Sequence, residues 1–72
     1  MTDEGSVYKR IELVGVSKKS WEDAIGNVVA KASKSIRDLR IAEVDQLDVT
    51  IEDGKVVTYR VRVKISFKYE KD

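Results

Sequence analysis

The sequence predicts one α+β domain, in which a strand is followed by a helix and then by a two-stranded hairpin. Three observations predict this fold. β-Branched residues are frequent in residues 7–16, apolar residues recur with helical spacing from Trp21 onward, and two alternating runs meet at Asp53-Gly54. A right-handed crossover through the helix leaves a gap that the last strand fills, antiparallel to both neighbours. We therefore expect a β-α-β-β order and a three-stranded antiparallel sheet with one helix on one face.

The first strand is expected over residues 7–16, VYKRIELVGV. Alternate residues of a strand point to opposite faces of the sheet. One face is then apolar, formed by Val7, Ile11 and Leu13. The other face is mixed, formed by Tyr8, Arg10, Glu12 and Val14.

The helix is expected to begin after Ser20, which has the character of an N-cap followed by two acids, Glu22 and Asp23. Its apolar stripe is about four turns long and consists of Trp21, Ala24, Ile25, Val28, Val29, Ala32 and Ile36. Basic residues lie toward its C-terminal end, where the helix dipole favours them, namely Lys31, Lys34 and Arg37. Trp21 belongs to the stripe, so we interpret it as a packing residue.

The hairpin is expected to follow Asp38 and to turn at Asp53-Gly54. The apolar phase slips between Val44 and Leu47, which predicts a β-bulge near Asp45-Gln46. The last strand shows the clearest alternation in the chain. Its apolar face consists of Val57, Tyr59, Val61, Val63, Ile65, Phe67 and Tyr69.

The composition limits the classes of function. The 72 residues include neither Cys nor His, so we expect no thiolate, imidazole base or zinc centre, and no catalytic turnover. The net charge of +1 provides no overall attraction to nucleic acid or anionic membranes. No long apolar segment predicts a membrane span or a signal peptide, and we expect a cytoplasmic protein with a disordered segment at residues 1–6 and one domain at residues 7–70.

A chain of this length buries only about 60% of the surface that its unfolded form exposes. Disulfides and structural zinc, the usual supports of small domains, are excluded by the absence of Cys and His. Association with further copies is the remaining common solution, so we expect a homo-oligomer.

The chain resembles the dodecin family over roughly residues 7–70. The segments that carry the resemblance are VYKRIELVG at 7–15, SWEDA at 20–24, IRDLRIAEV at 36–44 and IEDGK at 51–55, with TYRV and VKISF in the last strand. The resemblance implies a sheet partly wrapped around its helix and a hollow homododecamer of 23 symmetry. It also implies a protein that binds, stores or buffers a small ligand.

Flavin, as FMN or riboflavin, is the ligand that the resemblance implies first. Flavin-binding dodecins hold the ring at two-fold axes, with a Trp before the Ala-Glu-Val segment and a Gln on the last strand. Here Ile41 and Arg60 stand at these places. An aliphatic side chain provides no aromatic stacking, and Arg cannot accept a hydrogen bond from the flavin imide, so we expect flavin binding to be weakened. The candidate flavin residues are Ile41, Glu43, Gln46 and Arg60.

A divalent cation such as calcium is the alternative ligand. The segments Arg40-Ile41-Ala42 and Thr58-Tyr59-Arg60 resemble the calcium-binding branch of the family. Hard oxygen ligands are available at Asp45, Asp48 and Glu52. Their spacing is not that of an EF-hand loop, so symmetry-related copies would have to complete the six to eight ligands that Ca²⁺ requires. A plain exposed polar face explains the same acids without a metal.

Single-stranded nucleic acid is a third hypothesis. A row of basic residues on the last strand has the spacing to track phosphates, namely Arg60, Arg62, Lys64 and Lys68. The aromatic residues of that strand have the opposite parity, however, so stacking platforms are not interleaved with the charges. We therefore expect no nucleic-acid partner.

Overall fold

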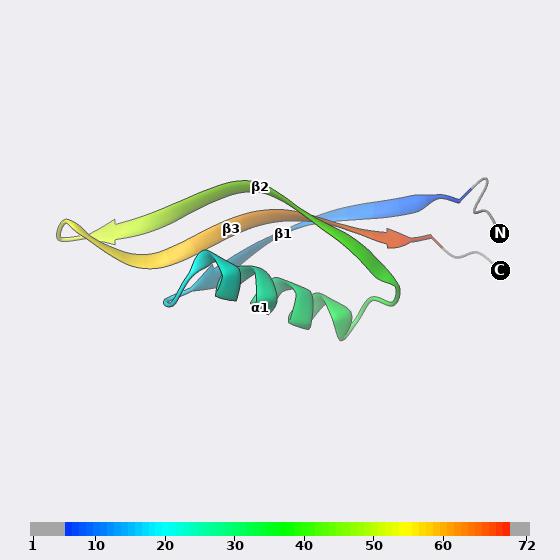
Figure 1. The fold of residues 1–72 in the computed structure, drawn as a ribbon, viewed down its shortest axis with the longest axis horizontal. Coiled ribbons are helices and arrows are strands. Elements are labelled where there is room, and N and C mark those ends of the chain that lie inside the picture. The colour runs from blue at the N-terminus through cyan, green and yellow to red at the C-terminus, as the bar shows by residue number, and fades with distance from the viewer. Residues whose placement is uncertain (1–5, 70–72) are drawn as a thin grey trace.

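The computed structural model describes residues 6–69 and contains four elements, β1 (Tyr8–Ser17), α1 (Trp21–Ser33), β2 (Leu39–Glu52) and β3 (Lys55–Lys68). β3 lies between β1 and β2 and is antiparallel to both. One helix lies against one face of the curved sheet (Figure 1). The predicted α+β class, element order and three-stranded antiparallel sheet are confirmed. The predicted segment 1–6 lies outside the described residues except for Ser6, and so does Glu70.

The start of α1 is set by its polar cap. Ser20 precedes the helix in an extended conformation, and its hydroxyl accepts a hydrogen bond from the Asp23 amide at 3.0 Å. The Ser17 hydroxyl donates to the Asp23 carboxylate at 2.7 Å and accepts from the Lys19 amide at 2.8 Å. The bond from Asp23 satisfies one of the amides that the first turn of a helix leaves free, and the Ser17 bonds stabilise the turn from β1 into α1.

The predicted end of the helix is wrong. α1 ends at Ser33, so Ile36 and Arg37 lie outside the helix. The Lys34 amide donates to the Lys31 carbonyl, and the Ile36 amide donates to the Ala32 carbonyl, so the last free carbonyls are satisfied by a tightened turn. Asp38 then has a positive φ of 62°, which redirects the chain into β2.

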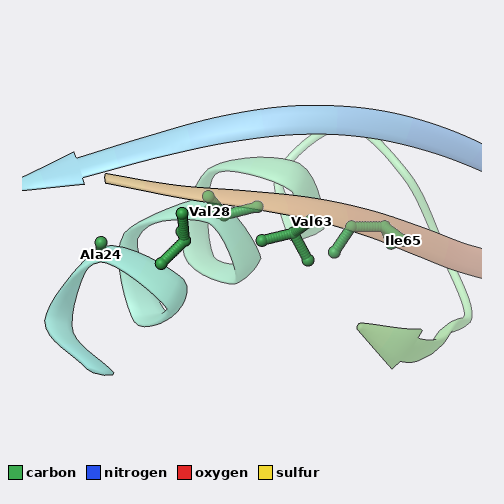
Figure 2. Packing of buried hydrophobic residues seen from close by; sticks show 5 residues of the cluster. Ala24, Val28, Val63 and Ile65 are labelled. Carbon is green, nitrogen blue, oxygen red and sulfur yellow. The ribbon is translucent and has the colours of Figure 1, made fainter. Parts of the chain in front are cut away.

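The core forms where α1 meets β1 and β3. Its central side chains are Val61, Val63 and Ile65 of β3, each at most 1% exposed. Ala24 and Val28 of the helix pack against them (Figure 2). Gly15 of β1 permits this close approach, because a Cβ there would lie 2.4 Å from Val28 Cγ2 and 2.6 Å from the Ala24 carbonyl oxygen. The helix therefore lies directly on β1.

The two strand pairs differ in regularity. β1 and β3 pair without interruption from Tyr8 opposite Lys68 to Ser17 opposite Tyr59. β2 and β3 pair with three register shifts. The shift between Val44 and Gln46 is the predicted bulge, with Asp45 as the extra residue, and the other two shifts, at Arg40 and near Thr50, were not predicted. The hairpin turns as predicted at Asp53-Gly54, both with positive φ, which is typical of a type I′ turn.

Candidate functional site

The face of the sheet opposite α1 carries the polar groups of the subunit, and we call it the open face. Its membership follows from alternation, because the neighbours of the buried Val61, Val63 and Ile65 must point away from the helix, and cross-strand partners share a face. On β1 it comprises Tyr8, Arg10, Glu12, Val14 and Val16. On β3 it comprises Arg60, Arg62, Lys64, Ser66 and Lys68, and on β2 it comprises Ile41, Glu43, Gln46 and Asp48. Asp45, the extra residue of the bulge, reaches the same face through its contact with Lys64.

Four ion pairs cross the open face and connect all three strands. The tightest is bidentate, with Arg60 Nε and Nη2 donating to the two Asp48 carboxylate oxygens at 2.8 and 3.0 Å. Three further pairs are Lys64 Nζ to Asp45 Oδ2 at 2.9 Å, Arg10 Nη2 to Glu43 Oε1 at 2.9 Å, and Arg62 Nε to Glu12 Oε2 at 3.4 Å. The pair between Arg10 and Glu43 spans β3 and links the two edge strands.

These pairs shift the protonation equilibria of two carboxyl groups. The hydrogen bond from Arg60 lowers the pKa of Asp48 below its ordinary value, and the attraction of the Arg60 and Arg62 charges adds to it. The hydrogen bond from Lys64 lowers the pKa of Asp45 in the same way. The hydrogen bond to Asp48 in turn raises the pKa of Arg60. Both acids therefore lie in the open face as carboxylates held by cations.

The predicted flavin residues all lie on the open face, but one subunit does not bring them together. Gln46 and Arg60 line a hollow of about 110 Å³ between β1 and β2. Ile41 lies opposite Ser66, six residues along β3 from Arg60, which corresponds to about 20 Å. Glu43 is engaged by Arg10. Small-molecule sites have volumes of about 300–1,000 Å³, so the hollow alone is too small for a flavin ring system.

The predicted metal ligands are also separate within one subunit. Asp45 and Asp48 are paired with Lys64 and Arg60, and Glu52 lies at the end of β2 opposite Lys55. Among residues 6–69, no group of three or more acids, Cys or His is arranged to hold a metal ion. A cation site that uses these acids would need ligands from further copies.

A pair of packed aromatic rings lies on the helix side of the sheet. The rings of Trp21 and Tyr59 pack edge to face, with centroids 5.2 Å apart. The Trp21 indole also donates a hydrogen bond to the Asp48 carbonyl at 3.0 Å. Trp21 packs against the hydrophobic core, as predicted, and provides no stacking surface on the open face.

The sequence analysis did not identify the partners of Arg60 and Lys64, which are Asp48 and Asp45. The only signal that could have identified these partners is the β2–β3 register, which depends on the bulge at Asp45.

These features define the class of protein, a small α+β subunit. In the described part of the chain, the only helix covers one face of the sheet, and the other face carries ion pairs and exposed aliphatic residues. Residues 7–70 match the family model described as Dodecin. The chain belongs to the dodecin family, which contains flavin-binding dodecins and a calcium dodecin.

Two curated relatives cover nearly the whole chain. Calcium dodecin of Mycobacterium tuberculosis is 40% identical over 63 residues, which are 88% of this chain and 89% of the relative. Dodecin of Thermus thermophilus is 39% identical over 66 residues, which are 92% of this chain and 96% of the relative.

Two solved structures show the same fold. Dodecin from Streptomyces coelicolor superposes with a TM-score of 0.89 at 35% identity, covering 94% of this chain and 97% of the other. The crystal structure of the M. tuberculosis calcium dodecin, described as a calcium-chelating antigen with a novel calcium-binding site, superposes with a TM-score of 0.79 over 93% of this chain and 96% of the other. In this chain, no helix of residues 6–69 combines the length and the apolar character needed to cross a membrane.

Proposed function

We propose that this chain is the subunit of a hollow homododecamer of 23 symmetry that binds, stores or buffers a small ligand without catalysing a reaction. The shape of the subunit supports this proposal. Its accessible surface is 5407 Å², whereas a compact monomer of 8.2 kDa exposes about 4,500 Å². Its radius of gyration of 15.0 Å exceeds the roughly 11 Å of a compact domain of this length. Such an extended subunit is suited to association.

Light scattering coupled to size exclusion tests the assembly. Twelve copies of an 8.2 kDa chain have a mass of about 98 kDa. We expect this mass at micromolar subunit concentrations. A monomer or dimer throughout that range contradicts the proposed shell.

Flavin is the ligand class that the family provides, and we propose that it binds here more weakly than in relatives with a Trp at the position of Ile41. Ile41 is 58% exposed on the open face. The aromatic residue of that face among residues 6–69 is Tyr8, which lies at the start of β1 opposite Lys68. Aromatic stacking adds about 0.5–1.5 kcal/mol beyond burial, and Ile41 does not supply it. Titration of the assembled protein with FMN, followed by quenching of flavin fluorescence, measures the remaining affinity.

Calcium is a second candidate ligand, favoured by 40% identity to a relative named for binding it. The candidate ligands are Asp45, Asp48 and Glu52. Because Asp45 and Asp48 are held by Lys64 and Arg60, Ca²⁺ has to compete with these ion pairs or use acids of further copies.

Calorimetric titration of the assembled protein with Ca²⁺ tests this candidate. We expect Glu52→Gln to weaken binding, because it removes a charged oxygen ligand. Glu22→Gln is the matched control, since Glu22 is an exposed acid of α1. Equal Ca²⁺ affinity in the parent and Glu52→Gln removes Glu52 from the site.

A further inference from the structure

The hollow between β1 and β2 lies on the open face where two arginine side chains lean apart. Arg60 leans toward β2, where it holds Asp48. Arg62 leans toward β1, where its Nε lies 3.4 Å from Glu12 Oε2. The lining of the hollow consists of Val14, Gln46, Asp48, Arg60, Val61 and Arg62. The Val61 side chain is buried on the helix side, so its backbone forms the floor, and the walls are mostly polar.

Several N–H groups that line this hollow are not used by the ion pairs. A guanidinium group carries five N–H donors, and Asp48 accepts only from Nε and Nη2 of Arg60. The contact of Arg62 with Glu12 is longer than the roughly 2.7–2.9 Å of a charge-assisted hydrogen bond. Gln46 adds an amide group with two further donors. The hollow therefore offers more N–H donors than the Asp48 carboxylate accepts.

The charge of the lining favours an anion over a cation. Two guanidinium groups, of Arg60 and Arg62, stand against one carboxylate, of Asp48, which leaves one positive charge in excess. The pKa of Asp48 is lowered first by the hydrogen bond from Arg60 and further by the charge of Arg62, so the field of Arg62 reaches this carboxylate. Because Asp48 is already neutralised by Arg60, the excess charge of the hollow is that of Arg62.

The size of the hollow limits its occupant to a small group. Its volume of about 110 Å³ corresponds to roughly three or four water molecules at about 30 Å³ each. This space accommodates one tetrahedral oxyanion and is well below the roughly 300–1,000 Å³ of sites for whole small molecules. Arginine suits phosphate in particular, because its planar fork binds two oxygens at once.

We infer that this hollow binds a phosphate group, with Arg62 and Gln46 as its principal donors and Arg60 as a supporting cation. The inference rests on the proposed role of the open face in ligand binding and adds a chemical class, a phosphate that is free or belongs to a phosphorylated ligand. All of the lining residues belong to one chain, so the hollow does not depend on the proposed assembly. Arg62 thereby becomes a residue that determines specificity.

Titration of the protein with inorganic phosphate, followed by the width of the phosphorus NMR signal, tests this inference. Ionic strength is held constant, because salt screens nonspecific attraction between exposed charges. The signal should broaden on binding to the parent. Arg62→Gln should weaken phosphate affinity at least about fivefold, since a charged donor is lost. Arg37→Gln is the matched control, because it removes the same charge from the exposed loop after α1 and should leave the affinity unchanged.

Gln46→Met is a second variant, which keeps a side chain of similar length and removes its amide. We expect a smaller loss of phosphate affinity, of about two- to fivefold. Circular dichroism shows whether each variant is folded, and Gln46→Met decides the matter if Arg62→Gln is not. Equal affinity in the parent and in the folded hollow variants overturns the inference. Equal losses in Arg62→Gln and Arg37→Gln overturn it as well, because phosphate would then respond only to overall charge.

Comparison of FMN with riboflavin separates the two sources of phosphate. If the parent binds FMN more tightly and Arg62→Gln abolishes only this preference, the phosphate of the ligand occupies the hollow. If both flavins bind alike while inorganic phosphate binds as expected, free phosphate occupies it. If neither flavin binds, the proposed flavin binding fails, whereas the titration with inorganic phosphate still decides whether the hollow is a phosphate site.

Discussion

The two faces of β3 are stabilised by different forces, although their residues alternate along one strand. Val61, Val63 and Ile65 are buried under α1. Between them, Arg62 and Lys64 point to the open face and pair with Glu12 and Asp45. The helix face is stabilised by exclusion of water from close-packed groups, whereas the open face is held by partly exposed ion pairs, which contribute little each.

This difference separates the residues that specify the fold from those available for function. Substitutions under the helix should act on folding, and substitutions on the open face should act on ligand binding and on the response to pH. The predictions below test this division, beginning with the largest expected effect.

Ile65→Ala should cause the largest loss of stability. Ile65 is 1% exposed in a core of few buried side chains, so its truncation removes apolar burial and leaves a cavity. We expect the free energy of unfolding to fall by about 2–5 kcal/mol. Urea unfolding at fixed subunit concentration, followed by circular dichroism, measures it.

Arg62→Ala is the control for the opposite face of the same strand. Its ion pair with Glu12 is long and exposed, so we expect the free energy of unfolding to change by no more than about 0.5 kcal/mol. Comparable losses in both variants would show that the open face contributes to folding as much as the core does.

The fold was predictable because its main signals are local. The alternation of β3, the Ser20 cap and the turn at Asp53-Gly54 each specify one element, and even the bulge at Asp45 left a phase slip in the sequence. The helix end was not predictable from periodicity, because Ile36 continues the apolar spacing although Asp38 redirects the chain. The unpredicted bulge at Arg40 leaves no comparable slip.

The candidate site was predictable only in part, since it depends on contacts between distant segments. Alternation placed Arg60 and Arg62 on one face. The choice of Asp48 as the partner of Arg60 depends on register after the bulge, and the pair of Arg10 with Glu43 crosses a whole strand. The separation of Ile41 from Arg60 along β3 has the same origin.

Ile41→Trp should strengthen flavin binding without a comparable effect on folding. Because Ile41 is exposed on the open face, a larger ring there meets no core atoms and offers a stacking surface. We expect a gain of about 0.5–1.5 kcal/mol per stacked contact, or roughly two- to twelvefold in affinity. Flavin fluorescence titration measures it.

Arg60→Gln, alone and combined with Ile41→Trp, refines this test. Gln supplies an acceptor for the flavin imide, so we expect a further gain in flavin affinity. The gains of the two substitutions need not be additive, because both residues would contact the same ligand. If the parent already binds FMN as tightly as Ile41→Trp does, residue 41 does not determine flavin affinity.

Gly26→Ala should give a smaller, stabilising effect. Gly26 lies within α1, and a Cβ at this position would meet no atom within 4 Å apart from the adjoining helix backbone. Glycine within a helix costs about 0.5–1 kcal/mol relative to alanine, so we expect the free energy of unfolding to rise by about that amount. Gly15→Ala is the contrasting variant, since its Cβ would collide with Val28 and Ala24, and it should destabilise. Loss of assembly in Gly26→Ala would mean that the outer side of the helix packs against another copy.

The smallest expected effect is a loss of folding stability at acid pH, and it should arise from the ion pairs of the open face alone. The pKa of Asp48 is lowered by the hydrogen bond from Arg60, and that of Asp45 by the hydrogen bond from Lys64. A carboxyl group whose pKa is lower in the folded state stabilises that state fully above its unfolded pKa, near 3.8, and loses this contribution as the pH falls through the folded value. Stability due to these pairs should therefore be constant near neutrality and decline below about pH 4.

Asp48→Asn isolates this contribution. At neutral pH the variant should be slightly less stable than the parent, because the charged bidentate pair with Arg60 is lost. As the pH falls from about 3.8 through the lowered pKa of folded Asp48, this carboxylate becomes protonated in the parent and the two proteins should converge in stability. Because the pair is partly exposed, added salt at neutral pH should reduce the difference as well. Urea unfolding of both proteins across pH and salt measures these trends. A difference that persists unchanged in acid would mean that Asp48 acts through packing or through its backbone bond to Trp21, and the electrostatic account of the open face would then be wrong.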